Sequence, residues 1–558
     1  MSASSINPIK IVVLICVLLI SNESAVGQER MNGPKIIQME TGEILADNVI
    51  YESWSQYAAS DFFRNQGMRC GTPSRVGLGQ VAGGGPGDCT YSLTNPDEVY
   101  APSVVRYRIP VVVHVIRRSD GVTGHISEEM VESQIDILNE DHLAIPGTNG
   151  AEGTNVQIEF YLATRDPSGQ PTNGITYSNN TTWYNDQGRY WRTLAWDTSR
   201  YMNVYTNSAG GYLGYVPDLP QGEIAGESFD RVVVYWASFG RNGPIGPPYN
   251  QGRTLTHEVG HYLGLEHTFS GGCAGTANCN TNGDLICDTN PEAEPTFGCT
   301  NLLSCGSSDP IHNYMDYSDD LCMFEFTPEQ SRRMRCSLVY YRADLFDEMS
   351  LTCGTGADQE CGPKNRYLSF ERPVDPGVDT THAALLVTLV DLPDFPSANG
   401  RQWWVGAPST IREDHVRRAF LWAQLQCDPY LADWSNAFVL NVSGSAVVPG
   451  STYEVRLVGP ECIADGDESC MSDPITITTA KWGDVVAPYA TEDQPNFSDI
   501  AAEVEAFKRV FEAPSKTRSQ LQPDSPNPAN PISFSDIGKV VEGFKQVPYP
   551  FAGPAQCP

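Results

Sequence analysis

One run, HEVGHYLGLEH at positions 257–267, restricts the fold of this chain more than any other stretch. On a helix, His257 and His261 lie four residues apart and project from the same face, which makes them a chelating pair for Zn²⁺. Gly264 permits a positive φ that ends the helix, so His267 can return as a third nitrogen ligand. Three protein ligands leave one tetrahedral position of zinc open for water, and an open position is typical of a catalytic site.

Glu258 follows the first histidine and is the expected general base, because it can take the proton of a water molecule that the metal activates. The alternative for such a run is an ordinary polar helix face. That alternative is disfavoured because the spacing of all three histidines, the glutamate and Gly264 coincide in one stretch. The sequence therefore predicts metal-assisted hydrolysis.

A second run, NYMDY at 313–317, matches the turn that follows this extended motif in the metzincins. The residues around both runs resemble the pappalysin family of metzincins over about residues 104–350. This resemblance implies a mixed five-stranded sheet with helices, a floor formed by Met315 beneath the zinc, and Tyr317 beside the metal as a donor to an oxyanion. The expected activity is that of a zinc endopeptidase acting on proteins or peptides. The alternative is a catalytically inert surface-binding protein on the same scaffold.

The N-terminus indicates export. Lys10 precedes the apolar run 11–20, and residues 25–27 are small enough for signal-peptide cleavage, so residues 1–27 are predicted to be a secretory signal. The run is too short to span a bilayer, and no membrane span is predicted elsewhere. Acidic residues outnumber basic ones by 68 to 36, a net charge of −32, which argues against a nucleic-acid partner.

Cysteine parity indicates one unpaired thiol. Removal of Cys16 with the signal leaves an odd number of cysteines in an oxidising compartment. Cys70 is the candidate, because a thiolate can fill the open position of the zinc and because Arg69-Cys70-Gly71 resembles the cysteine switch of metzincin zymogens. The alternative is a local disulfide between Cys70 and Cys89.

The cysteines near the two runs are expected to form disulfides, since the chain is exported. Resemblance to the pappalysins pairs Cys273 with Cys305 and Cys299 with Cys322, which leaves Cys279 and Cys287 for a further bridge. Cys462 and Cys470 form another local pair by their spacing.

Oxygen-bearing side chains of the same loop predict a calcium site. Asp284, Asp288 and Thr289 gather there, and the resemblance also implies Ca²⁺. Hydrogen-bonded turns explain the same residues equally well.

The chain is too long for one core and is predicted to be a multidomain α+β protein. A repeat of Phe-Ser-Asp-Ile at 497 and 534 predicts two amphipathic helices and resembles a degenerate dockerin-type duplication, whose loops lack a full set of calcium ligands. The C-terminal modules are candidates for anchoring to a surface or matrix. The expected units are a signal peptide at 1–27, a pro-segment with a cysteine switch at 28–103, the metzincin domain at 104–350, a β-sandwich-like domain at 365–485 and the helical repeat at 490–558.

Three aspartates just after the second run bear on specificity. Asp316, Asp319 and Asp320 lie in the segment that forms the wall of the S1′ pocket in metzincins, where a carboxylate would pair with a basic side chain. We therefore expect cleavage before Arg or Lys. Turn hydrogen bonds are the alternative role of these aspartates, and Leu321 could make the pocket floor apolar instead.

Overall fold

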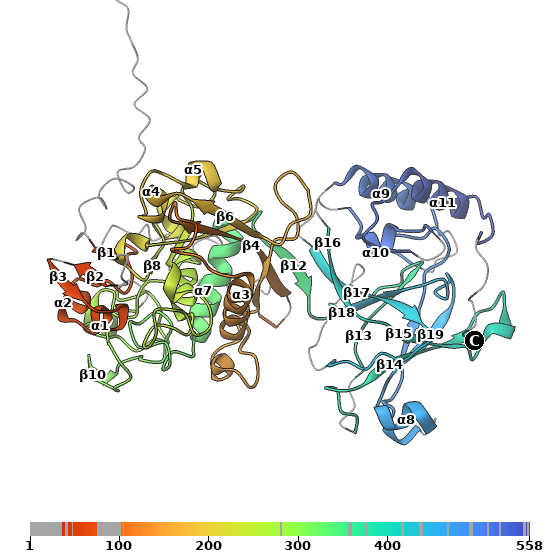
Figure 1. The fold of residues 1–558 in the computed structure, drawn as a ribbon. Coiled ribbons are helices and arrows are strands. Elements are labelled where there is room, and N and C mark those ends of the chain that lie inside the picture. Colours follow the sequence, from red (N-terminus) through yellow and green to blue (C-terminus); the bar gives the residue numbers. More distant parts are fainter. Residues whose placement is uncertain are drawn as a thin grey trace, which may run out of the picture.

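The computed structural model contains two halves that lie side by side and meet at β12 (Figure 1). The expected signal peptide, Cys16, Cys89 and residues 75–100 of the expected pro-segment lie outside the described residues. The described residues are 36–38, 43–46, 48–74, 102–103, 105–279, 282–354, 360–373, 377–413, 418–434, 439–465, 468–489, 495–510, 513–523, 526–550, 554 and 557.

A mixed sheet forms the centre of the first half. Its longest strand, β4 (Val105–Arg117), is rich in β-branched residues and almost completely buried, as expected for a strand covered on both faces. The sheet order is β5 and β6 on one edge of β4, then β7, β9 and β8 on the other, with β8 antiparallel to its neighbour β9. The other strands are β5 (Ile158–Leu162), β6 (Ile175–Asn179), β7 (Met202–Asn207), β8 (Gly214–Tyr215) and β9 (Val232–Tyr235).

Helices complete this half. The helix α3 (Glu128–Leu143) begins where the Ser127 side chain accepts a hydrogen bond from the Met130 amide, which satisfies one of the free amides of the first turn. The helix α7 (Pro328–Tyr341) begins with a capping box made by Thr327 and Gln330. The remaining helices are α4 (Thr181–Tyr184), α5 (Trp191–Leu194) and α6 (Arg253–Tyr262), with short 3₁₀ turns η4 (Asn149–Glu152), η5 (Ala209–Gly211), η6 (Pro220–Gly222), η7 (Trp236–Ser238) and η8 (Gly272–Thr276).

The N-terminal segment packs against the same half. Trp54, Tyr57 and Phe63 share a hydrophobic cluster with Tyr235 and Tyr249 of the sheet and its loops. This segment contains β1 (Ile36–Gln38), β2 (Ile44–Ala46), β3 (Val49–Tyr51), α1 (Trp54–Ala58) and α2 (Asp61–Asn65). A separate small hairpin, formed by β10 (Leu303–Ser304) and β11 (Ser307–Ser308), lies later in the chain.

The strand β12 (Asp347–Ser350) joins the two halves. It pairs antiparallel with β4 and parallel with β17, so the sheet of the first half continues into the second. The buried carboxylate of Asp347 reinforces this junction by accepting hydrogen bonds from Tyr161 and Arg412. The predicted boundary between residues 350 and 365 is therefore crossed by a continuous hydrogen-bonded sheet.

Strands of the second half share one core. Leu368, Leu385, Val405, Val442 and Val455, from five different strands, belong to one buried cluster, and Trp403 packs into it. The strands are β13 (Tyr367–Glu371), β14 (Ala384–Asp391), β15 (Gln402–Val405), β16 (Ser409–Glu413), β17 (Arg418–Gln426), β18 (Val439–Ser443), β19 (Thr452–Val458) and β20 (Ile475–Thr478), with α8 (Pro460–Asp465), η9 (Pro396–Ala398) and η10 (Glu468–Cys470) between them.

The tail contains two equivalent helices, α9 (Phe497–Lys508) and α11 (Phe534–Phe544), with the short α10 (Lys516–Ser519) between them. Each longer helix begins with a capping box whose third residue is the aspartate of the repeat, Asp499 or Asp536. Both carboxylates also accept backbone amides of the preceding segment. The repeated aspartates thus fix helix starts and the approach of the chain to each helix.

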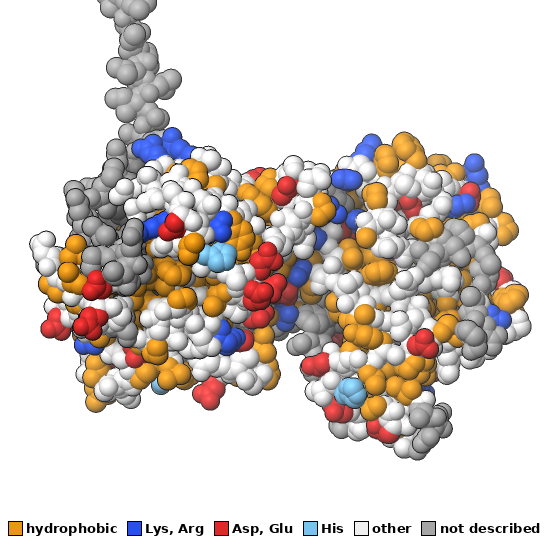
Figure 2. Space-filling model, viewed as in Figure 1, with side chains coloured by type: hydrophobic (Ala, Val, Ile, Leu, Met, Phe, Trp, Pro, Cys, Tyr) orange, Lys and Arg blue, Asp and Glu red, His pale blue; other side chains and the backbone are white. Residues whose placement is uncertain are grey.

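Among the described helices, none combines the length and the apolar character needed to cross a bilayer. On the face in Figure 2, acidic side chains lie in small groups over both halves, with basic side chains scattered among them.

Candidate active site

The helix α6 carries His257 and His261, and its end brings His267 back toward them. Gly264 has φ 94°, and a Cβ atom there would lie 2.4 Å from Ser337 Oγ. Only glycine fits this conformation in this space. All three histidines are buried.

The ring nitrogens of the three histidines converge. His261 Nε2 lies 3.2 Å from His257 Nε2 and 3.0 Å from His267 Nε2. The Nδ1 atoms of His257 and His261 lie 2.7 Å and 2.8 Å from the carbonyl oxygens of Tyr314 and Leu265. A carbonyl only accepts, so Nδ1 of each ring carries the proton and its Nε2 lone pair faces the other histidines.

This donor set fits a zinc ion. A tetrahedral zinc with Zn–N bonds of about 2.0–2.1 Å holds two ligand nitrogens roughly 3.3 Å apart, which is close to the separations here. Burial lowers the pKa of all three histidines, that of His261 to about 4, so the rings are neutral and their lone pairs are available. The three converging ring nitrogens in this buried site could therefore hold a metal ion.

Cys70 completes this cluster. Its Sγ and the nitrogens of the three histidines all lie within 4.8 Å of one another. The residue is buried and its thiol is free, so the alternative bridge between Cys70 and Cys89 is not formed. Burial, followed by the neighbouring Glu258 carboxylate, raises the pKa of Cys70, and a cation beside the sulfur would favour the thiolate.

The residues around Cys70 cover Glu258. The Thr72 hydroxyl donates to Glu258 Oε2 at 3.1 Å, and Cys70 Sγ lies 3.5 Å from the same oxygen. The backbone of this segment pairs with the edge strand β8, through Gly71 N to Gly214 O at 2.9 Å. Thr72 was not predicted from the sequence, where its position just after the Arg-Cys-Gly run was the only available signal.

The run 313–317 packs against α6. A Cβ atom on Gly260 would lie 2.3 Å from Met315 Sδ, so the glycine of the zinc motif makes room for this methionine. The Tyr317 ring contacts those of His257 and His267, and its hydroxyl donates to the Cys70 carbonyl oxygen at 3.3 Å. The tyrosine hydroxyl therefore faces the same space as the histidines.

The aspartates after this run take separate positions. Asp320 is buried and lies 3.5 Å from Arg69 Nη2, and it also accepts the Gln251 amide at 2.8 Å. Asp316 instead accepts hydrogen bonds from the Ser318 hydroxyl and the Thr296 amide, and Asp319 is half-buried. The Leu321 side chain is 76 % exposed, so the expectation that it forms a pocket floor is wrong. Asp320, which is in contact with Arg69, is therefore the candidate for recognition of a basic side chain, and Asp319 interacts electrostatically with the same guanidinium.

A buried pair of carboxyl groups lies behind the run 313–317. Burial and the neighbouring Asp316 raise the pKa of Glu292, and burial raises the pKa of Asp316. Glu292 accepts hydrogen bonds from Thr268, next to the third histidine, and from Thr296. The pair therefore retains a proton at pH values above those at which carboxyl groups ordinarily ionise. No sequence signal indicated Glu292, because its partners are known only from the fold.

This pair gives the protein a pH-dependent stability. Between the ordinary pKa of glutamic acid and the raised pKa of Glu292, the folded chain keeps a proton that the unfolded chain releases, so stability falls as pH rises. Glu292→Gln cannot ionise, and we expect its Tm to rise relative to the wild type between about pH 5 and pH 8. Thermal unfolding over this range measures the difference, with the exposed Glu132→Gln as control. Parallel pH profiles for wild type and Glu292→Gln would contradict the shared proton.

Disulfides fix the loop between the third histidine and the Met315 turn. The structure contains Cys273–Cys305, Cys279–Cys287 and Cys299–Cys322. Cys462–Cys470 is also present, so these four bridges are the expected pairs. Cys353–Cys361 and Cys427–Cys557 were not predicted.

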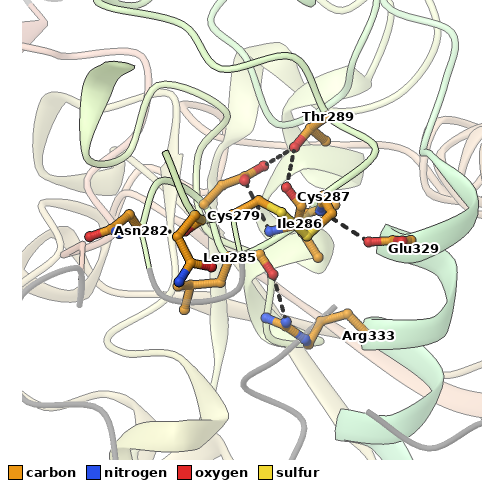
Figure 3. Close-up of a disulfide and its surroundings, with 10 residues drawn as sticks. Cys279, Asn282, Leu285, Ile286, Cys287, Thr289, Glu329 and Arg333 are labelled. Carbon is orange, nitrogen blue, oxygen red and sulfur yellow. Dashed lines mark hydrogen bonds between the residues drawn. A yellow bond between two sulfur atoms is a disulfide. The ribbon is translucent and has the colours of Figure 1, made fainter. Parts of the chain in front are cut away.

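The predicted calcium ligands do not all face one point. Thr289 lies near the Cys279–Cys287 disulfide of the same loop (Figure 3). Asp284 accepts hydrogen bonds from the Thr289 hydroxyl at 2.7 Å and from the Ile286 amide at 3.1 Å. Asp288 turns instead to the start of α7, where it accepts from Thr327 and from the Glu329 amide. Within the described part of the chain, the only cluster of three or more His, Cys, Asp or Glu ligands is that of Cys70 and the histidines.

The region that carries these residues matches a known protein family. The family described as pregnancy-associated plasma protein-A, Peptidase_M43, matches residues 177–339. Extracellular metalloprotease 1 of Coccidioides posadasii is 35% identical over 226 residues, which covers 39% of this chain and 72% of that protein. An extracellular metalloprotease of Colletotrichum graminicola is 36% identical over 243 residues, 42% of this chain and 77% of that protein. Mirolysin in a solved complex is 35% identical and covers 43% of this chain and 96% of its own, with a TM-score of 0.38.

The site and these relatives define the class of the protein, which is a metalloendopeptidase. More narrowly, the chain belongs to the M43 peptidases, the pappalysin family.

Proposed function

We propose that this chain is a secreted zinc endopeptidase that is made as a latent zymogen, with Glu258 as its general base. The observation that carries the proposal is the convergence of Cys70, His257, His261 and His267 on one buried point beside Glu258. The expected export signal and the extracellular relatives support secretion.

In this mechanism His257, His261 and His267 would hold the zinc, which would supply Lewis acidity toward water and a peptide carbonyl. Glu258 takes a proton from the attacking water and delivers it to the leaving amine. Tyr317 now donates to the Cys70 carbonyl oxygen, and a substrate carbonyl in the same place would receive that hydrogen bond as negative charge develops. The edge strand β8 offers its backbone to an extended substrate.

Latency in this proposal has two parts. The Cys70 sulfur would fill the metal-ligand position at which the attacking water must bind. The Thr72 hydroxyl donates a hydrogen bond to Glu258, the carboxylate that would take the proton of that water. Ser74 adds a hydrogen bond to Glu266 at 3.1 Å. Release of residues 68–74 would free the fourth ligand position, Glu258 and the edge of β8 together.

We further propose that the mature enzyme cleaves before Arg or Lys. In the latent chain the guanidinium of Arg69 lies against Asp320 and over the ring of Tyr249, in a buried position. Arg69 directly precedes Cys70, the residue at the metal site. Its buried position therefore supports the presence of a pocket next to the metal site that accepts a guanidinium group. Asp320 would then pair with the side chain that follows the scissile bond.

The test is the cleavage profile of the activated protease on a peptide library, with a chelator-treated sample as blank. We expect Arg and Lys to dominate after the scissile bond, and Asp320→Asn to lower kcat/KM for such peptides by about 10- to 100-fold, because a charge-assisted hydrogen bond is lost. For peptides with Leu after the scissile bond, kcat/KM of Asp320→Asn should differ little from that of the wild type. Asp344→Asn, which removes an exposed carboxylate, is the control. A wild-type profile dominated by Leu or Phe would exclude this specificity.

Two further parts complete the proposal. Calcium binding is proposed for Asp284 and Thr289 alone, whose oxygen atoms lie 2.7 Å apart, because Asp288 is directed to the start of α7. Attachment to a surface or matrix is proposed for the second half of the chain, including the dockerin-like pair α9 and α11, which leaves Phe497 and Phe534 largely exposed.

A further inference from the structure

Asp141, near the end of α3, connects three elements through one carboxylate. It accepts hydrogen bonds from Thr256 Oγ1 at 2.6 Å and from the Tyr314 hydroxyl at 2.8 Å. Arg253 Nη2 lies 3.2 Å from the same carboxylate. All four side chains are buried. Asp141 therefore ties α3 both to the helix that carries two histidines and to the Met315 turn.

Two of these contacts lead to His257. Thr256 precedes His257 on α6, and the Tyr314 carbonyl oxygen accepts the hydrogen bond from His257 Nδ1. That hydrogen bond sets both the tautomer and the orientation of the ring, so the location of the Tyr314 backbone decides where His257 Nε2 points. The Tyr314 backbone is held in turn by the bond from its own hydroxyl to Asp141.

A carboxylate is costly to bury, and this one is retained only because its partners satisfy it. Burial raises the pKa of Asp141 to about 6, while Arg253 and the hydroxyls of Thr256 and Tyr314 act in the opposite direction. An apolar side chain could fill this space without the cost of burying a charge. Thr256 donates to Oδ2 and Tyr314 donates to Oδ1, so each oxygen of the carboxylate holds one of the two elements.

We propose that Asp141 is a positioning residue for the metal site, which acts on His257 through Tyr314 and Thr256. The inference rests on the zinc site proposed above. It requires that weakening the Asp141–Tyr314 contact alters metal binding, not only the stability of the fold.

The test measures metal binding to the full-length chain, so it does not depend on proteolytic activity. Zn²⁺ affinity is determined by competition with a chelator, and the visible spectrum of the Co²⁺-loaded chain reports the ligand geometry. Tyr314→Phe removes only the hydroxyl and leaves the Arg253 and Thr256 contacts in place. We expect about 10- to 100-fold weaker Zn²⁺ binding and an altered Co²⁺ spectrum for Tyr314→Phe, and a loss at least as large for Asp141→Asn.

Asp347→Asn is the matched control. Asp347 is also buried and also accepts from a tyrosine and an arginine, Tyr161 and Arg412, but it lies on β12. This variant should lose thermal stability and keep wild-type metal affinity. Wild-type Zn²⁺ affinity and spectra in both Tyr314→Phe and Asp141→Asn would overturn the inference, as would an equal loss of affinity in Asp347→Asn. A wild-type chain that binds neither ion would overturn the zinc site itself.

Discussion

Glu258→Ala is expected to bind zinc as the wild type does and to lose roughly 10³- to 10⁴-fold in kcat/KM, which is the upper range for removal of a general base. The three histidines are held by their own hydrogen bonds and by the turn at Gly264, and none of these contacts involves the Glu258 side chain. The carboxylate is instead directed at the space that Cys70 and Thr72 fill. Removing it should therefore affect proton transfer and leave the ligand set intact.

The measurement uses the chain activated by removal of its pro-segment, with a casein-type substrate and a determination of bound zinc. Glu258→Gln keeps the shape of the side chain and cannot take a proton, so it should be nearly as inactive as the alanine variant. Glu266→Gln is the control, because Glu266 is another buried carboxylate next to a histidine and contacts Ser270. Turnover by Glu258→Ala within a few-fold of the wild type would remove Glu258 from the mechanism.

The second large effect concerns latency. Full-length Cys70→Ala should cleave substrate, or process itself, without an activator, while the wild-type proform is silent. Among the described residues of the pro-segment, only Cys70 contributes a side-chain atom to the cluster of metal-binding atoms, so loss of its sulfur should open the fourth position to water. Cys70→Ser provides a comparison of similar size with a much poorer ligand.

Assays of the unprocessed proforms against a quenched peptide decide between two forms of latency. Thr72→Val retains the thiol and loses the hydroxyl that covers Glu258, so it should stay largely latent if the sulfur dominates. If Cys70→Ala stays as silent as the wild type, the backbone pairing of residues 68–71 with β8 blocks the cleft sterically.

The parts of this site that the sequence predicts are local. The four-residue spacing of His257 and His261 matches the helical period. Gly264 predicts the turn that ends the helix and places His267 beside the other two histidines. Asp141 could not be found in this way, because its partners Thr256 and Tyr314 lie 115 and 173 residues away in the chain. Such contacts exist only once α3 has packed beside α6.

The same distinction holds for the fold. The strand β4 was predictable because a run of Val and Ile at 109–116 matches a strand that is buried on both faces. The strand β12 has the sequence DEMS, whose composition does not indicate a strand, and it forms only because β4 and β17 both offer free backbone edges. The tail helices were predictable from their repeat, but the role of Asp499 and Asp536 in holding the preceding segments was not.

The continuity of the sheet through β12 affects how the enzyme could reach a substrate. A flexible linker would let a tethered protease domain move through the volume around its attachment point. It would encounter many peptide bonds there, each at a moderate effective concentration. Here the hydrogen-bonded path runs from β20 through β17 and β12 to β8 at the cleft. If the second half of the molecule is attached to a surface, that attachment would also fix the distance and orientation of the cleft relative to the surface. The enzyme would then reach only those peptide bonds that lie close to its point of attachment.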